Sequence, residues 1–223
     1  ETPQSKGGQM NILASGTERI PALLALEDGT TYRGYVVGAP GEAWGEIVFN
    51  TSMVGYQEVV SDPSYAGQIV TLTYPQVGNY GVIPEVMQSD GLHLRALVVR
   101  DMCTHPSNWQ STESFPELLA RHNIMAIEGI DTRALTLHIR EHGTQRALIS
   151  TLDTDPASLT ERARNLPFIG ETNLVATVSR PEPTTIPATT DERFNVVAYD
   201  CGIKRGIIDG LTRNGCSVTL VPW

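Results

Sequence analysis

The stretch that decides the fold is FNTSMVGYQEVVSDPSYAGQIVTLTYPQVGNYG, residues 49–81. It joins two strand patterns. Residues 45–51 are rich in β-branched and aromatic side chains, and residues 68–74 end before Pro75, which cannot donate to a sheet. The residues between the two patterns strongly favour turns, and they contain no ordinary catalytic motif. This combination predicts strands that carry a binding face.

The turn between these strands contains the segment Ser61-Asp62-Pro63-Ser64-Tyr65. The Asp62 side chain can accept a hydrogen bond from a backbone N–H two or three residues on, and the fixed φ of Pro63 suits the first turn of a helix. A helical turn is therefore predicted here, with Ser64 where N–H groups and a hydroxyl can meet a polar ligand. Taken alone, Ser64 is also explained as a turn serine bonded to local backbone. It lacks the G-x-S-x-G and S-x-x-K surroundings of a hydrolytic nucleophile.

In residues 21–152, short strand patterns and Gly/Pro turns come first, and helix patterns that alternate with strand patterns follow. This order is typical of a mixed α/β domain. Asp28-Gly29 predicts a hairpin between residues 23–26 and 31–37, because both turn positions tolerate positive φ. Further strands are predicted at residues 92–99, 124–127 and 146–150. Helices are predicted from Ser114, which can form a capping box with Glu117, from Asp131 to Gly143, and from Asp155-Pro156 to Asn165.

Residues 167–193 change in composition, and three prolines there, Pro181, Pro183 and Pro187, indicate a linker or an extended strap. Beyond them, residues 194–199 and 217–221 predict two parallel strands, buried on both faces and joined by a helix at 204–214. The expected organisation is an N-terminal extension at 1–20, a β/β/α-type domain at 21–152, a helix and Pro-rich linker at 153–192, and the first βαβ unit of an incomplete domain at 193–223.

The composition describes a globular chain of 223 residues, 40% of them hydrophobic, with a formal net charge of -9. No cluster of Lys and Arg exceeds two neighbours, so we expect no nucleic-acid partner. No apolar run approaches the ~20 residues that span a bilayer, and residues 1–20 lack a signal-peptide pattern. We therefore expect no membrane association and a cytoplasmic location, and residues 1–20 do not enter the fold prediction.

The three cysteines, Cys103, Cys201 and Cys216, are odd in number and unrelated in spacing. Such a set favours reduced, buried thiols over a disulfide framework or a zinc site. Cys103 and His105 lie close in sequence, but no carboxylate near them would orient the imidazole. A catalytic Cys–His pair is therefore not expected.

Two further patterns have both a functional and a structural interpretation. The segment from His138 to His142 (HIREH) matches a zinc-protease motif, but Gly143 ends the helix at once and no third ligand is evident. A histidine in the last turn of a helix also interacts favourably with the helix dipole without a metal. Residues 196–202 (VVAYDCG) can receive an anion at a helix N-terminus, or can form a tight strand-to-helix connection. We expect the structural interpretation, and no metal site, in both cases.

Residues 49–81 resemble the N-terminal domain of the small, glutamine-hydrolysing subunit of carbamoyl-phosphate synthetase. Members of this family carry similar FNTSM-GYQE, DPSY, QIVTLTYP and GN segments in the same order. The similarity continues through LALEDGT (residues 24–30), GEIVFNTSM (45–53), RHNIMAIEGIDTRALT (121–136) and VVAYDCGIKRGI (196–207). It covers nearly all of the chain after about position 20.

The resemblance implies that the complete small subunit hydrolyses L-glutamine and passes ammonia to a large subunit. The large subunit joins the ammonia to bicarbonate and so makes carbamoyl phosphate for arginine and pyrimidine synthesis. The ATP, magnesium and potassium sites would belong to that large subunit, so no cofactor is expected in this chain. Ser64 is the one site residue that the resemblance transfers, because the serine of the DPSY segment contacts bound glutamine in related subunits.

The resemblance also implies that residues 193–223 begin a class I glutamine amidotransferase domain. In that class the nucleophile is a cysteine on a G-x-C-x-G elbow, activated by a histidine that a glutamate orients. None of the three cysteines here matches, and the family's nucleophile lies farther along the second domain. No catalytic residue is thus expected in this chain, and alone it is predicted inactive. A non-catalytic protein-interaction module and a metalloprotease built on His138 and His142 remain as alternatives.

Overall fold

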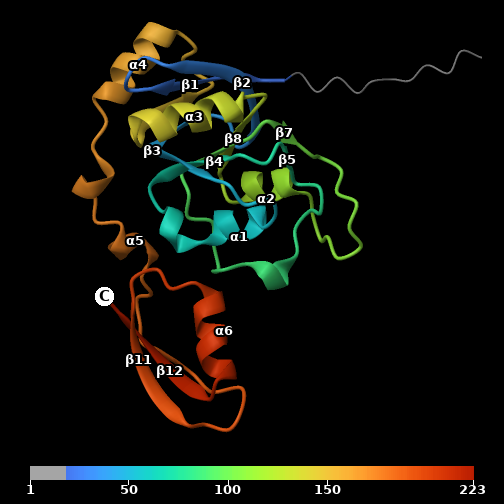
Figure 1. Ribbon diagram of the computed structural model, residues 1–223, viewed down its shortest axis with the longest axis vertical. Helices are drawn as coiled ribbons and strands as arrows, with labels where there is room; N and C mark the ends of the chain where they lie inside the picture. The colour runs from blue at the N-terminus through green and yellow to red at the C-terminus, as the bar shows by residue number, and fades with distance from the viewer. Residues whose placement is uncertain (1–18) are drawn as a thin grey trace, which may run out of the picture.

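The computed structural model describes residues 19–223, so the extension predicted for residues 1–20 lies almost entirely outside the described residues. The described chain forms two units: a barrel surrounded by helices, and a small three-stranded sheet covered by one helix, here called the C-terminal sheet unit (Figure 1). The mixed α/β class is confirmed. The strands and α-helices are β1 (Pro21–Leu26), β2 (Thr31–Gly38), β3 (Glu42–Asn50), α1 (Tyr56–Ser61), β4 (Gln68–Leu72), β5 (Gln76–Val77), β6 (Ala96–Val98), β7 (Asp101–Met102), α2 (Phe115–Arg121), β8 (Met125–Glu128), α3 (Thr132–His142), β9 (Gln145–Ser150), α4 (Pro156–Arg164), α5 (Val175–Val178), β10 (Thr184–Ile186), β11 (Phe194–Asp200), α6 (Arg205–Arg213) and β12 (Cys216–Pro222).

Seven strands close into a barrel in the order β1-β2-β8-β6-β4-β3-β9. The pairs β3–β4, β4–β6 and β6–β8 are parallel, and the other pairs around the barrel are antiparallel. Because the barrel is closed, these strands leave no unpaired sheet edge. Alternate side chains point inward and form one buried cluster, which includes Leu24, Ile47, Ile69, Ile127 and Ile149.

The predicted hairpin at Asp28-Gly29 is confirmed, with β1 and β2 paired antiparallel. The strand predicted at residues 92–99 is wrong in length, because only β6, residues 96–98, pairs in the barrel. The Arg95 N–H still donates to the Gln68 carbonyl of β4 at 2.7 Å, but the His93 N–H donates to the Val60 carbonyl at the end of α1, 3.3 Å away. The chain therefore leaves α1 near His93 and joins the sheet only at Arg95.

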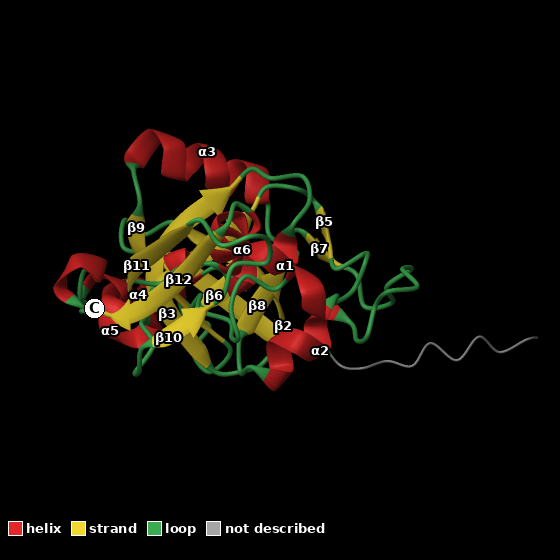
Figure 2. Cartoon of the chain, turned by 90° about the horizontal axis from the view of Figure 1, so that it is seen from below, coloured by secondary structure: helices red, strands yellow, loops and turns green. Residues whose placement is uncertain are grey.

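The helices surround the strands rather than lying on one side of them (Figure 2). α3 contributes Leu135 and Ile139 to the cluster inside the barrel, whereas α2 packs on the outside. The predicted caps are confirmed: the Asp131 side chain accepts from the Ala134 N–H, and Ser114 and Glu117 form the capping box of α2. Asp155 caps α4, whose Leu159 and Ala163 pack on β1 and β9.

Sequence patterns did not predict α1, which lies between β3 and the DPSY turn. It begins after Gly55, whose φ of 87° lies in the left-handed region, and no side chain caps it. The helix nevertheless forms because Tyr56, Val59 and Val60 are buried against the outside of the barrel. Tertiary packing thus replaces the missing cap.

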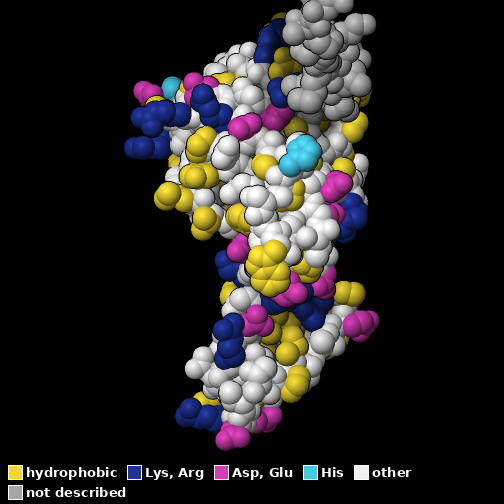
Figure 3. Space-filling view, turned by 90° about the vertical axis from the view of Figure 1, so that its right-hand side faces the viewer, with side chains coloured by type: hydrophobic (Ala, Val, Ile, Leu, Met, Phe, Trp, Pro, Cys, Tyr) yellow, Lys and Arg dark blue, Asp and Glu magenta, His cyan; other side chains and the backbone are white. Residues whose placement is uncertain are grey.

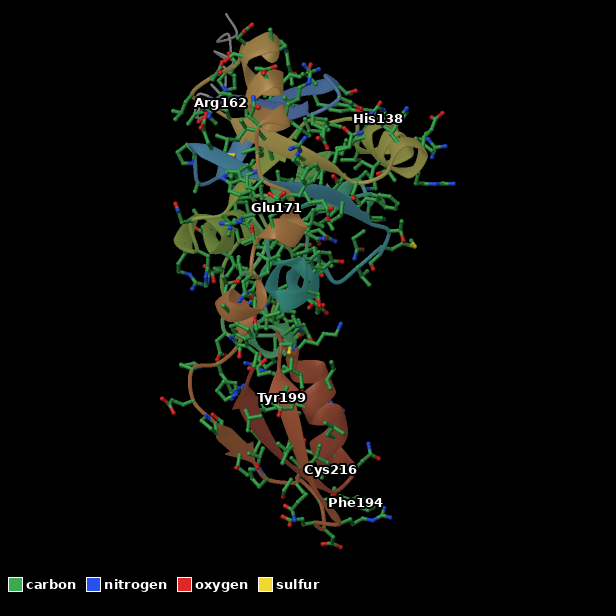
Figure 4. All side chains as sticks on the ribbon, turned by 90° about the vertical axis from the view of Figure 1, so that its left-hand side faces the viewer. His138, Arg162, Glu171, Phe194, Tyr199 and Cys216 are labelled. Atoms are coloured by element: carbon green, nitrogen blue, oxygen red, sulfur yellow. The ribbon has the colours of Figure 1, made fainter. Side chains whose placement is uncertain are left out.

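In the C-terminal sheet unit, β11 and β12 pair in parallel and α6 joins them, as predicted. The predicted linker also contributes a strand, because β10 pairs antiparallel with β12. Burial of the parallel strands on both faces is wrong for this chain: α6 covers Val218 and Leu220, but Val197 and Tyr199 of β11 are 69% and 74% exposed. Figure 4 shows Tyr199 at the end of β11 near the barrel and Phe194 at the far end.

Helix length bears on membrane insertion. Within residues 19–223, no helix is long and apolar enough to cross a membrane. α3, with 11 residues, is about half as long as the ~20 residues that a bilayer requires.

Candidate functional site

The candidate site begins at the DPSY turn, a single 3₁₀ turn over Pro63–Tyr65. Asp62 Oδ1 accepts a hydrogen bond from the Ser64 N–H at 2.9 Å, which confirms the helical turn predicted to start here. The Asn50 amide donates to the Tyr65 hydroxyl at 2.9 Å, and so joins the turn to the end of β3. Ser64 itself is exposed. The turn is therefore held from both sides while its serine faces solvent.

The C-terminal sheet unit meets this turn at the β11–α6 connection. Lys204 Nζ lies 3.2 Å from Asp62 Oδ2, and a Cβ on Gly202 would lie 3.1 Å from Pro63 Cβ. Partial burial alone would raise the pKa of Asp62, but hydrogen bonds from Ser64 and the charge of Lys204 outweigh it and lower the pKa. Asp62 is thus a carboxylate shared between the two units.

The backbone N–H groups of the β11–α6 connection already donate hydrogen bonds to a carboxylate of the protein itself. Asp200, which is 4% exposed, accepts from the N–H groups of Gly202 and Ile203 at 3.1 and 3.0 Å. Burial alone would raise the pKa of Asp200, but these bonds and the 2.8 Å contact with Arg180 Nε lower it. The structural interpretation of residues 196–202 therefore fits better than an anion site.

A cleft of about 570 Å³ lies between the barrel and the C-terminal sheet unit. Ser89 and His93 line it from the barrel side, and Arg180, Arg205 and Asp209 line it from the other unit. Ser64 is not among the lining residues, although its neighbour Pro63 is. In Figure 3 the molecule narrows between the units, and acidic and basic side chains gather at this waist.

Comparison with known proteins identifies the family. The family model described as "Carbamoyl-phosphate synthase small chain, CPSase domain" matches residues 24–149. The chain belongs to this family. Two similar curated relatives are named carbamoyl phosphate synthase small chain. The one from Syntrophotalea carbinolica is 49% identical over 90% of this chain and 57% of its own length, and the one from Thermotoga maritima is 50% identical over 91% and 51%. The chain thus spans little more than half the length of these small chains.

A cysteine nucleophile needs a reactive, accessible thiol. The three cysteines of this chain are free: Cys103 is half-buried, Cys201 is exposed and Cys216 is buried. The Cys103 thiol donates to the His105 backbone carbonyl at 3.3 Å, while His105 Nδ1 contacts Thr104. The hydrogen bond of the imidazole is thus made with Thr104 and that of the thiol with a backbone carbonyl, so the two side chains do not form a Cys–His pair. The expectation that all three thiols are buried is correct only for Cys216.

The two histidines of the zinc-like motif stack on each other, with ring centroids 4.3 Å apart. His138 Nε2 lies 2.6 Å from Asp28 Oδ2, and His142 Nδ1 donates to the His138 carbonyl at 3.0 Å. Figure 4 shows His138 on α3 in the upper part of the barrel unit. Across residues 19–223, no group of three or more His, Cys, Asp or Glu side chains is placed to hold a metal ion. In this small chain the pair ties α3 to the β1–β2 hairpin.

The Asp28 carboxylate gives this contact a pH dependence. Partial burial alone would raise its pKa, but hydrogen bonds from Thr30, Gln145 and His138 outweigh burial and lower the pKa far below its usual value. A lowered folded-state pKa contributes stability above the unfolded-state value of about 3.9, and this stability is lost as the pH falls through the folded-state pKa. We expect the melting temperature of the unaltered chain to exceed that of Asp28→Asn at about pH 6, and the gap to close towards about pH 2. A gap of constant size across thermal melts in this range would contradict the assignment.

Sequence reasoning found Ser64 and Asp62 but not Lys204 or Gln88, which contact the same region from elsewhere in the chain. Lys204 and Asp62 are 142 residues apart, and no local pattern marks such a contact. The Asp-Pro pair was a sufficient signal for Asp62, because capping is a local interaction. A long-range partner can be found only from the packing of the two units.

Proposed function

We propose that this chain is the amino-terminal part of the small subunit of a glutamine-dependent carbamoyl-phosphate synthetase. The complete small subunit hydrolyses L-glutamine, and a large subunit uses the ammonia and ATP to form carbamoyl phosphate for arginine and pyrimidine synthesis. Membership of the small chain family supports this proposal. The name of the relatives, small chain of carbamoyl phosphate synthase, supports a large partner subunit.

The observation that carries the proposal is the position of Ser64. Its backbone N–H donates to Asp62, which also binds Lys204 of the second unit, and the residue is exposed at this junction. A hydroxyl on a rigid turn loses little freedom when it binds a ligand, which favours specific recognition. We infer that Ser64 contributes a hydrogen bond to the glutamine, as one wall of the glutamine site.

The remaining catalytic groups belong, in this proposal, to an amidotransferase domain of which β11, α6 and β12 form the beginning. The exposed Val197 and Tyr199 on the open face of β11 support further chain packing there. That continuation would supply the cysteine nucleophile and the histidine and glutamate that activate it. The ATP, magnesium and potassium sites would lie in the large subunit.

Ser64→Ala in the complete small chain with its large chain tests the proposal. We expect kcat/KM for glutamine to fall about tenfold or more, because a hydrogen bond to a charged or strongly polar ligand group is worth about 1.5–3 kcal/mol. Ammonia-dependent synthesis should stay unchanged, since ammonia bypasses the glutamine site. Steady-state assays with each nitrogen source measure both quantities.

Ser52→Ala is the matched control, because Ser52 is another exposed serine in the same region, outside the DPSY turn. It should leave both activities unchanged. An equal loss of glutamine-dependent and ammonia-dependent synthesis in Ser64→Ala would assign Ser64 a folding role and refute its contact with glutamine.

A further inference from the structure

Helix α6 begins without a cap of its own. Lys204 occupies its N-cap position, and the Lys204 side chain makes no capping hydrogen bond. The first N–H groups of a helix have no partner within the helix and need one elsewhere. Here that partner is Gln88. Its backbone carbonyl accepts from the Arg205 N–H at 2.7 Å, and its side-chain Oε1 accepts from the Gly206 N–H at 3.2 Å. The cap of α6 therefore comes from the barrel unit.

Gln88 is itself fixed by the end of α1. Its N–H donates to Ser61 Oγ at 2.9 Å, and its side-chain amide donates to the Val86 carbonyl at 3.1 Å. Ser61 is fully buried and directly precedes Asp62, the first residue of the DPSY turn. The ends of the two helices and the turn that carries Ser64 are thus linked through one residue, whose backbone bonds Ser61 and Arg205 and whose side chain bonds Gly206.

Two ion pairs flank this contact. Arg205 lies 3.0 Å from Asp90, whose side chain is fully exposed, so this pair contributes little because water screens it. The Lys204–Asp62 pair is less screened, because the Asp62 side chain is only 13% exposed, and it joins the two units beside the Gln88 contact. A Cβ on Gly206 would lie 3.2 Å from Gln88 Oε1. Glycine at position 206 therefore leaves room for Gln88 Oε1, the oxygen that caps the helix.

We propose that Gln88 is a positioning residue. By capping α6 from the barrel unit, it holds the C-terminal sheet unit against the DPSY turn and so sets the geometry of the glutamine site. The part of this inference that concerns glutamine rests on the proposed function. The capping contact itself does not, and the two parts have separate tests.

The capping contact is tested by amide hydrogen exchange at Gly206 in the 223-residue chain. Gln88→Met keeps the length of the side chain and the backbone acceptor of the Arg205 N–H but removes the side-chain acceptor of the Gly206 N–H, whereas Gln88→Glu keeps a side-chain acceptor and adds a charge that suits a helix N-terminus. We expect exchange at Gly206 to quicken about fivefold in Gln88→Met, the usual effect of a lost cap, and to stay at or below the original rate in Gln88→Glu. Unchanged exchange in Gln88→Met, or equally fast exchange in both variants, would overturn the cap.

The positioning role is tested in the complete small chain with its large chain. If loss of the cap lowers the fraction of correctly docked molecules, Gln88→Met raises KM for glutamine by up to about fivefold, and Gln88→Glu restores it. Ammonia-dependent kcat stays unchanged. An unchanged glutamine KM in Gln88→Met, with the expected effect in Ser64→Ala, would overturn the positioning role alone. No effect in Ser64→Ala would overturn the proposed function and leave the cap intact.

Discussion

Replacing Gly202 by alanine is expected to destabilise the C-terminal sheet unit by about 2–5 kcal/mol. Two costs add. Gly202 has a φ of 95°, a left-handed conformation that costs an L-residue with a side chain about 1–2 kcal/mol. The new Cβ would also lie 2.9 Å from Val178 Cγ2 and 3.1 Å from Pro63 Cβ, and overpacking of this kind costs about 1–3 kcal/mol. Native-state amide exchange of β12 measures the change.

Gly210→Ala is the matched control, because it makes the same chemical change in the same unit. Gly210 lies inside α6, and a Cβ there meets nothing within 4 Å. Alanine is the better residue inside a helix, so this variant should be more stable by about 0.5–1 kcal/mol. If both variants shifted stability in the same direction, close packing of the β11–α6 connection on Pro63 would not explain the result.

Phe115→Ala is expected to lower the free energy of unfolding of the barrel unit by about 3–5 kcal/mol. Phe115 is fully buried at the start of α2, and its ring centroid lies 4.5 Å from that of Tyr56 in α1. The substitution leaves a cavity where both helices pack on the barrel. Urea unfolding monitored by circular dichroism measures the change.

Trp109→Ala is the control for this prediction. Trp109 is also a large aromatic residue, only six positions earlier, but it is 90% exposed. Its removal should change stability by no more than about 0.5 kcal/mol. A similar loss in both variants would mean that the barrel unit does not depend on Phe115 as its packing indicates.

Local interactions explain what could be predicted before the structure was known. Each of the three caps accepts a hydrogen bond from an N–H two or three residues further on, at Asp62, Asp131 and Asp155. The capped turn and the two capped helices could therefore be predicted from short sequence patterns. The hairpin at Asp28-Gly29 was predictable for the same reason, because Gly29, with a φ of 104°, supplies the left-handed conformation that its turn needs. Ser64 followed from the DPSY segment and its resemblance to a family.

Other features depend on contacts between distant residues. Neither α1 nor the short β6 has a local signal that separates it from its surroundings: burial on the barrel forms the helix, and pairing with β4 and β8 limits the strand. Closure of the barrel by β1 and β9 joins segments over a hundred residues apart. These outcomes depend on which surfaces meet, and a window of ten or fifteen residues does not contain that information.

By itself, the sequence determined the mixed α/β class, the capped helices and the βαβ unit, because each element has a local pattern of residues a few positions apart, and it determined the candidate serine through the resemblance of the DPSY segment to a family. Only the tertiary structure decided that the strands close into a barrel, that Lys204 reaches Asp62, and that Gln88 caps a helix more than a hundred residues away. The physical reason is that a backbone N–H can donate to any suitable acceptor and a carboxylate can accept from any suitable donor, and the packing of the two units selects which partner each one has.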